Sequence, residues 1–371
     1  MTQSNISDEI FIKDLEKNIL NYNSYNPIEK VYLHTDKDQY TNNEDIWFSA
    51  YITLGTKHHY SLASKVLHID FTSPKGKIVY TKSIPIEQGR GAGNITVPNT
   101  INSGEYQLRA YTQWMRNFSN DFFFKKNITV VNSKNANNSV IQVNDEIDIQ
   151  FFPEGGNLIS NLKGRVAFKA IGKDGLGKNI KGKIVDSNNK FVLNFSSKDQ
   201  GAGVFNLKPK LNERYTAILS NGKKINLPQV KNTGYSILLN NIDDRNIKVK
   251  IQASENLRGK KFYVTGFIHN EKYYQGKFEF GGKLVVDFEI PKGKLTTGLF
   301  TLTVFSEEGV PMAERIAFVN NNLDLNISTK VDVTNIKPGK KIPVEITVKD
   351  QRNWPVETDI SIAVTDADKF T

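Results

Sequence analysis

Hydrophobic and polar residues alternate with a period of two along most of this chain from Pro27 onward. Successive side chains of a β-strand point to opposite faces, so this alternation predicts strands with one buried and one solvent-facing side. The sequence therefore predicts antiparallel sheets, with these apolar sets facing inward: Ile46/Phe48/Ala50/Ile52, Leu67/Ile69/Phe71, Val166/Phe168/Ala170, Ile247/Val249/Ile251, Leu284/Val286/Phe288, Phe300/Leu302/Val304, Val344/Ile346/Val348 and Ile360/Ile362/Val364.

Turn-forming residues separate these strands at short intervals, at Ser73–Gly76, Lys173–Gly175, Ser187–Asn189 and Lys337–Gly339. About seven short strands per ~100 residues, with such turns between them, are typical of an immunoglobulin-like β-sandwich. In the first sandwich we expect Trp47 and His68 to point outward. We expect the inner faces of its two sheets to be formed by Ile46, Phe48, Leu67, Ile69, Phe71, Tyr106 and Leu108.

One pattern recurs three times: a Gly-rich turn, a strand that ends at proline, and a second short strand with an aromatic residue near its start. The recurrence indicates tandem homologous units. We predict β-sandwiches over residues 27–133, 134–230 and 231–321, and a partial one over 322–371. The last unit has no closing strand of this kind, so we expect the chain to be an N-terminal piece of a longer protein. The three copies are Gly91–Pro98 with Gly104–Leu108, Gly201–Pro209 with Tyr215–Leu219, and Gly281–Pro291 with Gly298–Leu302.

Residues 1–26 differ from the rest of the chain. Apolar residues recur there at four-residue spacing at Phe11, Leu15 and Ile19, after a candidate cap at Ser7. This predicts a short amphipathic helix at about 7–21. The fold class is thus all-β, with tandem sandwiches and a short N-terminal helix.

The composition narrows the function classes. The 371 residues include no cysteine, which excludes disulfides, thiolate metal sites and cysteine nucleophiles. No apolar run is long enough to predict a transmembrane segment. The first residues do not resemble a signal peptide, so either the protein is cytosolic or an initiating Met has replaced a signal peptide.

The net charge of +10 is concentrated in residues 134–230, where 15 Lys and Arg residues oppose eight Asp and Glu residues, giving +7. A basic face can bind an acidic protein, a polysaccharide or lipid headgroups, and the alternative is a solvated lysine-rich surface. We do not expect nucleic-acid binding, because neither a recognition helix nor an aromatic-plus-basic strand motif accompanies the charge.

The segment Val31–Tyr51 contains Thr35-Asp36-Lys37, Tyr40 and a turn at Asn42-Asn43 before an alternating strand. It resembles the opening of the second macroglobulin domain of the alpha-2-macroglobulin superfamily, in which Pro-Gly stands where this chain has Asn42-Asn43. A similar pattern recurs at Asn335–Ile346 with Pro-Gly present, and Asp359–Asp366 resembles a later strand of such domains. The resemblance implies macroglobulin-like β-sandwiches.

More narrowly, the stretch Phe151-Phe152-Pro153-Glu154-Gly155-Gly156 is similar to one in large envelope proteins of the Bacteroidota. Such proteins begin with a macroglobulin-type domain and often end in a domain similar to the plug of TonB-dependent receptors. The resemblance implies an extracytoplasmic location, in the periplasm or at the outer-membrane surface. It also implies a protein partner in the cell envelope, for example an outer-membrane protein.

Two histidine–aspartate pairs raise the question of chemistry. His34 and Asp36 lie at a strand-to-turn junction without a nucleophile motif, so we expect Asp36 to accept backbone amides of the turn. His68 and Asp70 lie two residues apart on one face of a predicted strand, with His58-His59 in the preceding loop. A metal site needs at least three converging ligands, so we interpret these residues as ordinary exposed polar groups. The Glu154–Gly156 turn is interpreted as a bulge or tight reversal.

The sequence thus predicts no catalytic, cofactor-binding or metal-binding residue and no cofactor. The function we expect is a non-enzymatic, extracytoplasmic scaffold or protein-interaction module. One alternative is an arm of a protease trap of the macroglobulin type, although a chain without cysteine cannot itself form the family's thioester. The other is a glycan-binding surface adhesin that stacks sugars on exposed aromatic residues, the candidates being Trp47, Tyr51, Tyr111, Trp114 and Tyr273-Tyr274.

Overall fold

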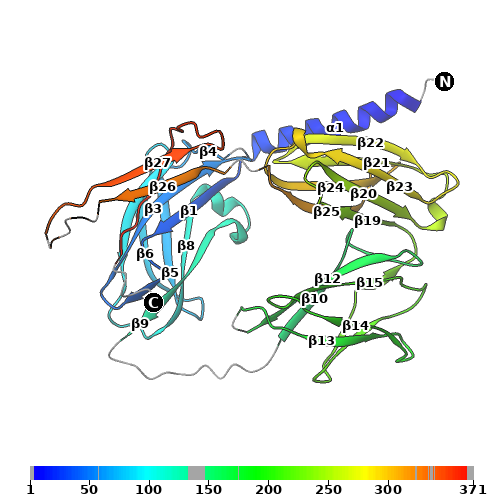
Figure 1. The fold of residues 1–371 in the computed structure, drawn as a ribbon, viewed down its shortest axis with the longest axis horizontal. Coiled ribbons are helices and arrows are strands. Elements are labelled where there is room, and N and C mark those ends of the chain that lie inside the picture. The colour runs from blue at the N-terminus through cyan, green and yellow to red at the C-terminus, as the bar shows by residue number, and fades with distance from the viewer. Residues whose placement is uncertain are drawn as a thin grey trace. The chain divides into compact units, whose positions relative to one another are not determined.

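The computed structural model describes residues 4–132, 147–321 and 324–365, apart from residues 57, 174, 333, 335, 336 and 338 (Figure 1). The chain divides into two compact units. The first comprises residues 1–139, 326–349 and 353–371, and the second comprises residues 140–325 and 350–352. Strands dominate both units, which confirms the predicted all-β class with tandem sandwiches and one N-terminal helix.

The first unit begins with helix α1 (Ser4–Tyr25). The helix is longer than the predicted 7–21, and Ser7 lies inside it rather than at its start. Leu20, Tyr22 and Tyr25 on its last turns are largely exposed to solvent. No helix among the described residues is long and apolar enough to cross a membrane.

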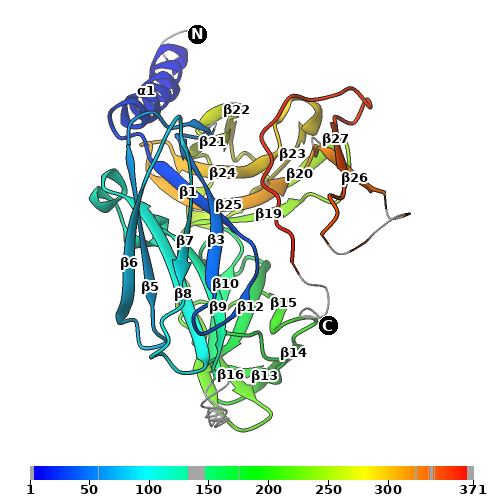
Figure 2. The ribbon, with the colours of Figure 1, turned by 90° about the vertical axis from the view of Figure 1, so that its left-hand side faces the viewer.

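A two-sheet sandwich follows (Figure 2). In one sheet β3 pairs with β1, β4 and β7, and the other sheet has the order β2-β9-β8-β5-β6. The 3-10 helices η1 (Trp114–Asn117) and η2 (Asn120–Phe122) precede β9. The strands are β1 (Glu29–Thr35), β2 (Gln39–Thr41), β3 (Asp45–Leu54), β4 (His59–Tyr60), β5 (Val66–Thr72), β6 (Ile78–Pro85), β7 (Arg90–Thr96), β8 (Gly104–Thr112) and β9 (Phe124–Val131).

The core of this sandwich matches the predicted inner faces. All seven residues expected to point inward are buried, from both sheets. Trp47 is 57% exposed, as expected for the opposite face of the same strand. The period-two pattern therefore assigned the register of these strands correctly.

The first unit also contains the antiparallel hairpin β26 (Asn326–Val331) and β27 (Val344–Lys349). The strand predicted at Asp359–Thr365 does not form. A strand requires a hydrogen-bonded neighbour, and no pairing involves these residues in the described part of the chain. Accordingly Ile362 and Val364, expected in a core, are 64% and 88% exposed.

The second unit contains two further sandwiches. In residues 147–231 the sheets are β10-β12-β15 and β14-β13-β16-β17, with β11 and β18 paired in parallel. The strands are β10 (Ile147–Pro153), β11 (Leu158–Ile159), β12 (Gly164–Gly172), β13 (Lys181–Val185), β14 (Phe191–Ser196), β15 (Ala202–Leu207), β16 (Thr216–Leu219), β17 (Lys224–Asn226) and β18 (Val230–Lys231).

In residues 235–319 the sheets are β19-β20-β23 and β22-β21-β24-β25. The 3-10 helices η3 (Glu255–Leu257) and η4 (Lys292–Lys294) lie between strands. The strands are β19 (Tyr235–Asn240), β20 (Asn246–Ala253), β21 (Lys261–Ile268), β22 (Glu271–Glu279), β23 (Val285–Pro291), β24 (Gly298–Ser306) and β25 (Pro311–Val319).

The repeated glycines have a structural role that their sequence pattern did not reveal. Gly93 and Gly203 lie within strands rather than in turns, opposite Phe48 and Phe168 respectively. A Cβ on Gly203 would lie only 2.3 Å from Cζ of Phe168, and one on Gly93 would lie 3.1 Å from Cζ of Phe48. In the first two sandwiches, therefore, glycine leaves room for a buried phenylalanine on the paired strand.

We retain the four predicted domain ranges as a proposal. Each set of sandwich strands falls within one range, except that Lys231 of β18 extends one residue beyond 230. The boundary predicted between residues 133 and 134 lies outside the described residues.

Candidate functional site

His34 and Asp36 are held by structural contacts. The Nδ1 atom of His34 hydrogen-bonds the hydroxyl of Ser361. Asp36 Oδ1 accepts the backbone amide of Trp47 at 2.9 Å and the hydroxyl of Tyr40 at 2.6 Å. Asp36 thus accepts a backbone amide as expected, but from strand β3 rather than from the turn.

Tyr40 is the centre of this group, with 1% of its surface exposed. Its hydroxyl also lies 2.9 Å from the carbonyl oxygen of Lys37 and accepts the Lys37 amide at 3.0 Å. Burial, reinforced by the Asp36 carboxylate, raises the pKa of Tyr40 far above its usual value. The phenol therefore stays protonated and acts as a fixed hydrogen-bonding group.

Glu44 completes the turn between β2 and β3. It pairs with Lys37 Nζ and accepts the Thr41 amide at 2.9 Å. Burial opposes its ionisation, but the hydrogen bonds from Lys37 and Thr41 outweigh burial and lower its pKa. Asn43 has φ of 63°, a left-handed conformation that asparagine tolerates better than most residues. This explains how Asn42-Asn43 replaces the Pro-Gly of the resemblance.

The second histidine–aspartate pair requires a correction. Asp70 is 1% exposed, not an exposed polar residue. It forms an ion pair with Arg109 (Oδ2 to Nη2, 2.6 Å) and accepts the Thr81 hydroxyl at 3.0 Å. The reason is that β5 is flanked by β6 and β8, whose side chains at the paired positions cover the carboxylate.

The histidines expected near Asp70 have other neighbours. His68 lies 2.9 Å from the Ser83 hydroxyl, and His58 lies 3.0 Å from Lys30 Nζ. Within the described residues no group of three or more His, Asp or Glu side chains could hold a metal ion.

The aromatic residues proposed for sugar stacking do not form a common platform. Tyr111 stacks on Phe123 with ring centroids 4.5 Å apart, and Tyr274 stacks on Phe288 at 5.2 Å. Trp114 Nε1 donates to the Pro27 carbonyl, and Tyr51 and Tyr273 are half-buried. Among the six candidates Trp47 alone has more than half of its surface exposed.

The Glu154 carboxylate joins the two sandwiches of the second unit. Its side chain is 5% exposed, and it pairs with Arg165 of its own sandwich at 2.7 Å. From the other sandwich it receives Arg315 Nε at 3.1 Å and the backbone amide of Leu239 at 3.0 Å. Arg165 Nη2 in addition donates to the Leu239 carbonyl at 3.2 Å. We call Glu154, Arg165, Arg315 and Leu239 the Glu154 clamp.

Gly155 brings the two backbones close enough for the clamp. It has φ of +92°, and a Cβ there would lie 3.2 Å from the Ile237 amide nitrogen. It also forms an isolated bridge with Glu314 of β25. The Glu154–Gly156 turn is therefore a contact between sandwiches rather than merely a tight reversal. An acidic residue between an apolar pair and two glycines was its signal in the sequence, but the partners lie up to 161 residues away.

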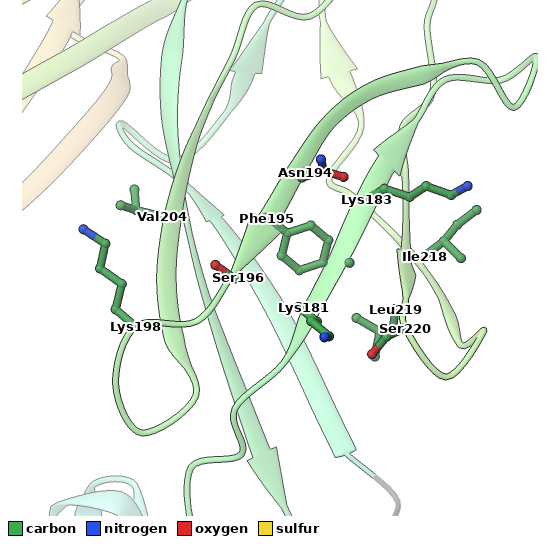
Figure 3. Close-up of a pocket in the computed structure, with 11 residues that line it drawn as sticks. Lys181, Lys183, Asn194, Phe195, Ser196, Lys198, Val204, Ile218, Leu219 and Ser220 are labelled. Atoms are coloured by element: carbon green, nitrogen blue, oxygen red, sulfur yellow. The ribbon is translucent and has the colours of Figure 1, made fainter.

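A lysine-lined hollow, with a volume of about 600 Å³, lies in the basic sandwich over β13, β14 and β16. Figure 3 shows Phe195 in the middle, with Lys198 and Val204 on one side and Lys183 and Ile218 on the other. The polar lining residues are Lys181, Lys183, Lys198, Asn194, Ser196 and Ser220, and none of the lining residues is acidic.

Comparisons with known proteins show distant likenesses of fold. No protein-family model matches the chain, and no curated protein does. The chain is similar to Escherichia coli alpha-2-macroglobulin activated by porcine elastase (10% identity, TM-score 0.29), with 87% of this chain covering 33% of that one.

Two other solved structures are similar. One is a tetra-tandem repeat in the extending region of a large adhesion protein (10% identity, TM-score 0.24), with coverage of 91% and 92% of the two chains. The other is domains 4–9 of the surface layer protein SbsC (12% identity, TM-score 0.26), with coverage of 88% and 54%. At these TM-scores none of the likenesses establishes a family, and the fold assignment rests on the strand pairing.

Proposed function

We propose that this chain is a non-enzymatic, extracytoplasmic scaffold or protein-interaction module of a multidomain cell-envelope protein. It serves in the periplasm or at the outer-membrane surface and binds a protein partner there, for example an outer-membrane protein. The macroglobulin-like and Bacteroidota-like motifs of the sequence motivate the location and the partner.

The observation that carries the proposal is the Glu154 clamp. A scaffold must hold its modules at fixed positions, and a buried carboxylate that contacts both sandwiches restricts their relative motion. Two aspartates that could suggest catalysis also have structural contacts. Asp36 accepts a hydrogen bond from the Trp47 amide of β3, and Asp70 of β5 forms an ion pair with Arg109 of the neighbouring strand β8.

The rigidity can be tested directly because the chain has no cysteine. We would introduce Asn188→Cys in the turn before β14 and Ile242→Cys in the exposed loop after β19. Spin labels at these positions report the distance between the two sandwiches. We expect a narrow distance distribution in the otherwise unchanged chain and a broad one when Glu154→Ala is added. A broad distribution without Glu154→Ala would contradict the rigid scaffold.

The other functions give different results. Hydrolysis of peptides or glycans that a single point substitution abolishes would contradict a non-enzymatic role. Compaction of the complete protein after limited proteolysis, measured by solution scattering, would instead support the arm of a protease trap. Binding on a glycan array that Trp47→Ala or Trp114→Ala removes would support an adhesin of the aromatic-stacking type.

A further inference from the structure

We propose that the lysine-lined hollow of the second sandwich is a binding site for a linear acidic polysaccharide. The site is independent of the scaffold function, because it lies on a sheet face that the Glu154 clamp does not use.

The strand register places its polar side chains on one face. In the strand register Lys181 lies opposite Ser196 of β14. Lys183 lies between Asn194 of β14 and Ile218 of β16. Lys181 and Lys183 are two residues apart on one strand, so they project to the same side about 6.5–7 Å apart. Amide and hydroxyl groups on the neighbouring strand flank them, and such groups can hydrogen-bond sugar hydroxyls.

The lysines of the hollow have no carboxylate partner. In the described part of the chain, neither Lys181 nor Lys183 nor Lys198 forms an ion pair, and none of their cross-strand neighbours is acidic. Asp199 follows Lys198 in the chain but does not line the hollow. Uncompensated charges at close spacing raise the local concentration of anions.

The neighbouring sandwich offers an internal contrast. A hollow of about 540 Å³ there contains Lys248 and Lys250 on β20, again two residues apart. Directly opposite them on β23 stand Glu289 and Asp287, and Asp287 pairs with Lys250 at 3.3 Å. Each of these two lysines thus faces a carboxylate on the paired strand, so the lack of acids around Lys181 and Lys183 is not a general feature of lysines on these sheets.

The shape of the site favours a chain over a single small anion. Lys183 and Lys198 lie on opposite sides of Phe195 in Figure 3 and do not converge on one point. A second hollow of about 430 Å³ adjoins the first and shares Lys181, Ser196, Leu219 and Ser220 with it. Its further lining includes Asn179 and Asn221 and no acidic residue. The polar surface therefore extends beyond the size of one anionic group.

The lining also distinguishes among polyanions. Proteins that bind single-stranded nucleic acids stack bases on exposed aromatic rings. Phe195 is the one aromatic residue in the lining of the two hollows, and it is 5% exposed. Lysines combined with amide and hydroxyl groups, and without a stacking platform, fit carboxylates and hydroxyls repeated along a polysaccharide.

The test is binding of polygalacturonate to the full chain by isothermal titration calorimetry, with neutral dextran as the reference ligand. Two double variants, Lys181→Ser/Lys183→Ser and Lys248→Ser/Lys250→Ser, each remove two strand lysines and the same charge. We expect the first to weaken binding by about tenfold or more, because it removes two charge-assisted hydrogen bonds, and the second to change it by less than about twofold.

Three results would overturn the proposal. One is no binding of polygalacturonate by the unaltered chain. Another is an equal loss in both double variants, which would indicate attraction to the net positive charge alone. The third is binding of anionic phospholipid vesicles or an oligothymidylate, through the same lysines, at least as tight as that of polygalacturonate. If the Lys181→Ser/Lys183→Ser variant fails to fold, Lys198→Ser in the following loop must itself weaken binding by about threefold.

Discussion

The substitution Glu154→Ala tests whether the Glu154 clamp stabilises the second unit. It removes a carboxylate that accepts hydrogen bonds from two arginines and one backbone amide. The Leu239 amide is left without its acceptor at a buried position. Arg165 and Arg315 each have side chains that are 42% exposed, so water can replace part of what they lose.

The expected cost follows from these exposures. Removing one member of a fully buried ion pair costs about 3–5 kcal/mol, and leaving a buried amide unpaired costs about 1–3 kcal/mol. Because both arginines can turn toward solvent, we expect a loss of about 2–4 kcal/mol in the free energy of unfolding. For a unit of this size that corresponds to a decrease in melting temperature of about 5–15 °C.

The assay combines thermal unfolding with amide hydrogen exchange at Leu239. Glu154→Gln keeps an oxygen for the Leu239 amide but loses the charge, so its cost should be lower, about 1–2 kcal/mol. Glu289→Ala is the matched control, because that exposed carboxylate of the same unit contacts Asn246 and should cost less than about 0.5 kcal/mol. A Glu154→Ala protein that melts within about 2 °C of the unaltered chain, with unchanged Leu239 exchange, would refute the reasoning.

Three further predictions concern single residues. Phe48→Ala should cost about 3–5 kcal/mol in urea unfolding, whereas His68→Ala should cost well under 1 kcal/mol, and the reverse order would mean a register shifted by one residue. Burial raises the pKa of Tyr235 to about 12, so its contribution to stability is complete below pH 10 and is lost as the pH rises through about 12. Tyr235→Phe should therefore flatten the alkaline decrease in stability, which the exposed-residue control Tyr32→Phe should leave unchanged; equal slopes in the two variants would contradict the assignment. Tyr40→Phe should cost about 1–3 kcal/mol in urea unfolding, since it leaves the half-buried Lys37 amide without this acceptor and Asp36 without the hydrogen bond from the phenol, and a cost below about 0.5 kcal/mol would show that the turn does not depend on this hydroxyl.

The sequence by itself determined the fold class and the inner faces of the first sandwich. Side-chain alternation in a strand is a local property, and Ile46 and Phe48 can be assigned to one face without knowledge of their partners. The same local reasoning failed at Asp359–Thr365, because an alternating segment becomes a strand only when another strand pairs with it.

Tertiary structure decided the role of every polar residue that had suggested chemistry. Asp70 became buried because strands on both sides cover it, and Glu154 gained partners in another sandwich. Likewise, both sandwiches of the second unit carry lysines on their strands. Only the pairing of strands shows that Lys250 lies opposite Asp287, whereas Lys183 lies opposite Asn194. Cross-strand neighbours such as Lys250 and Asp287 are far apart in sequence, so the local pattern does not show which residues meet. The physical reason is that burial and charge compensation depend on long-range pairing, whereas strand formation and facing depend mainly on local pattern.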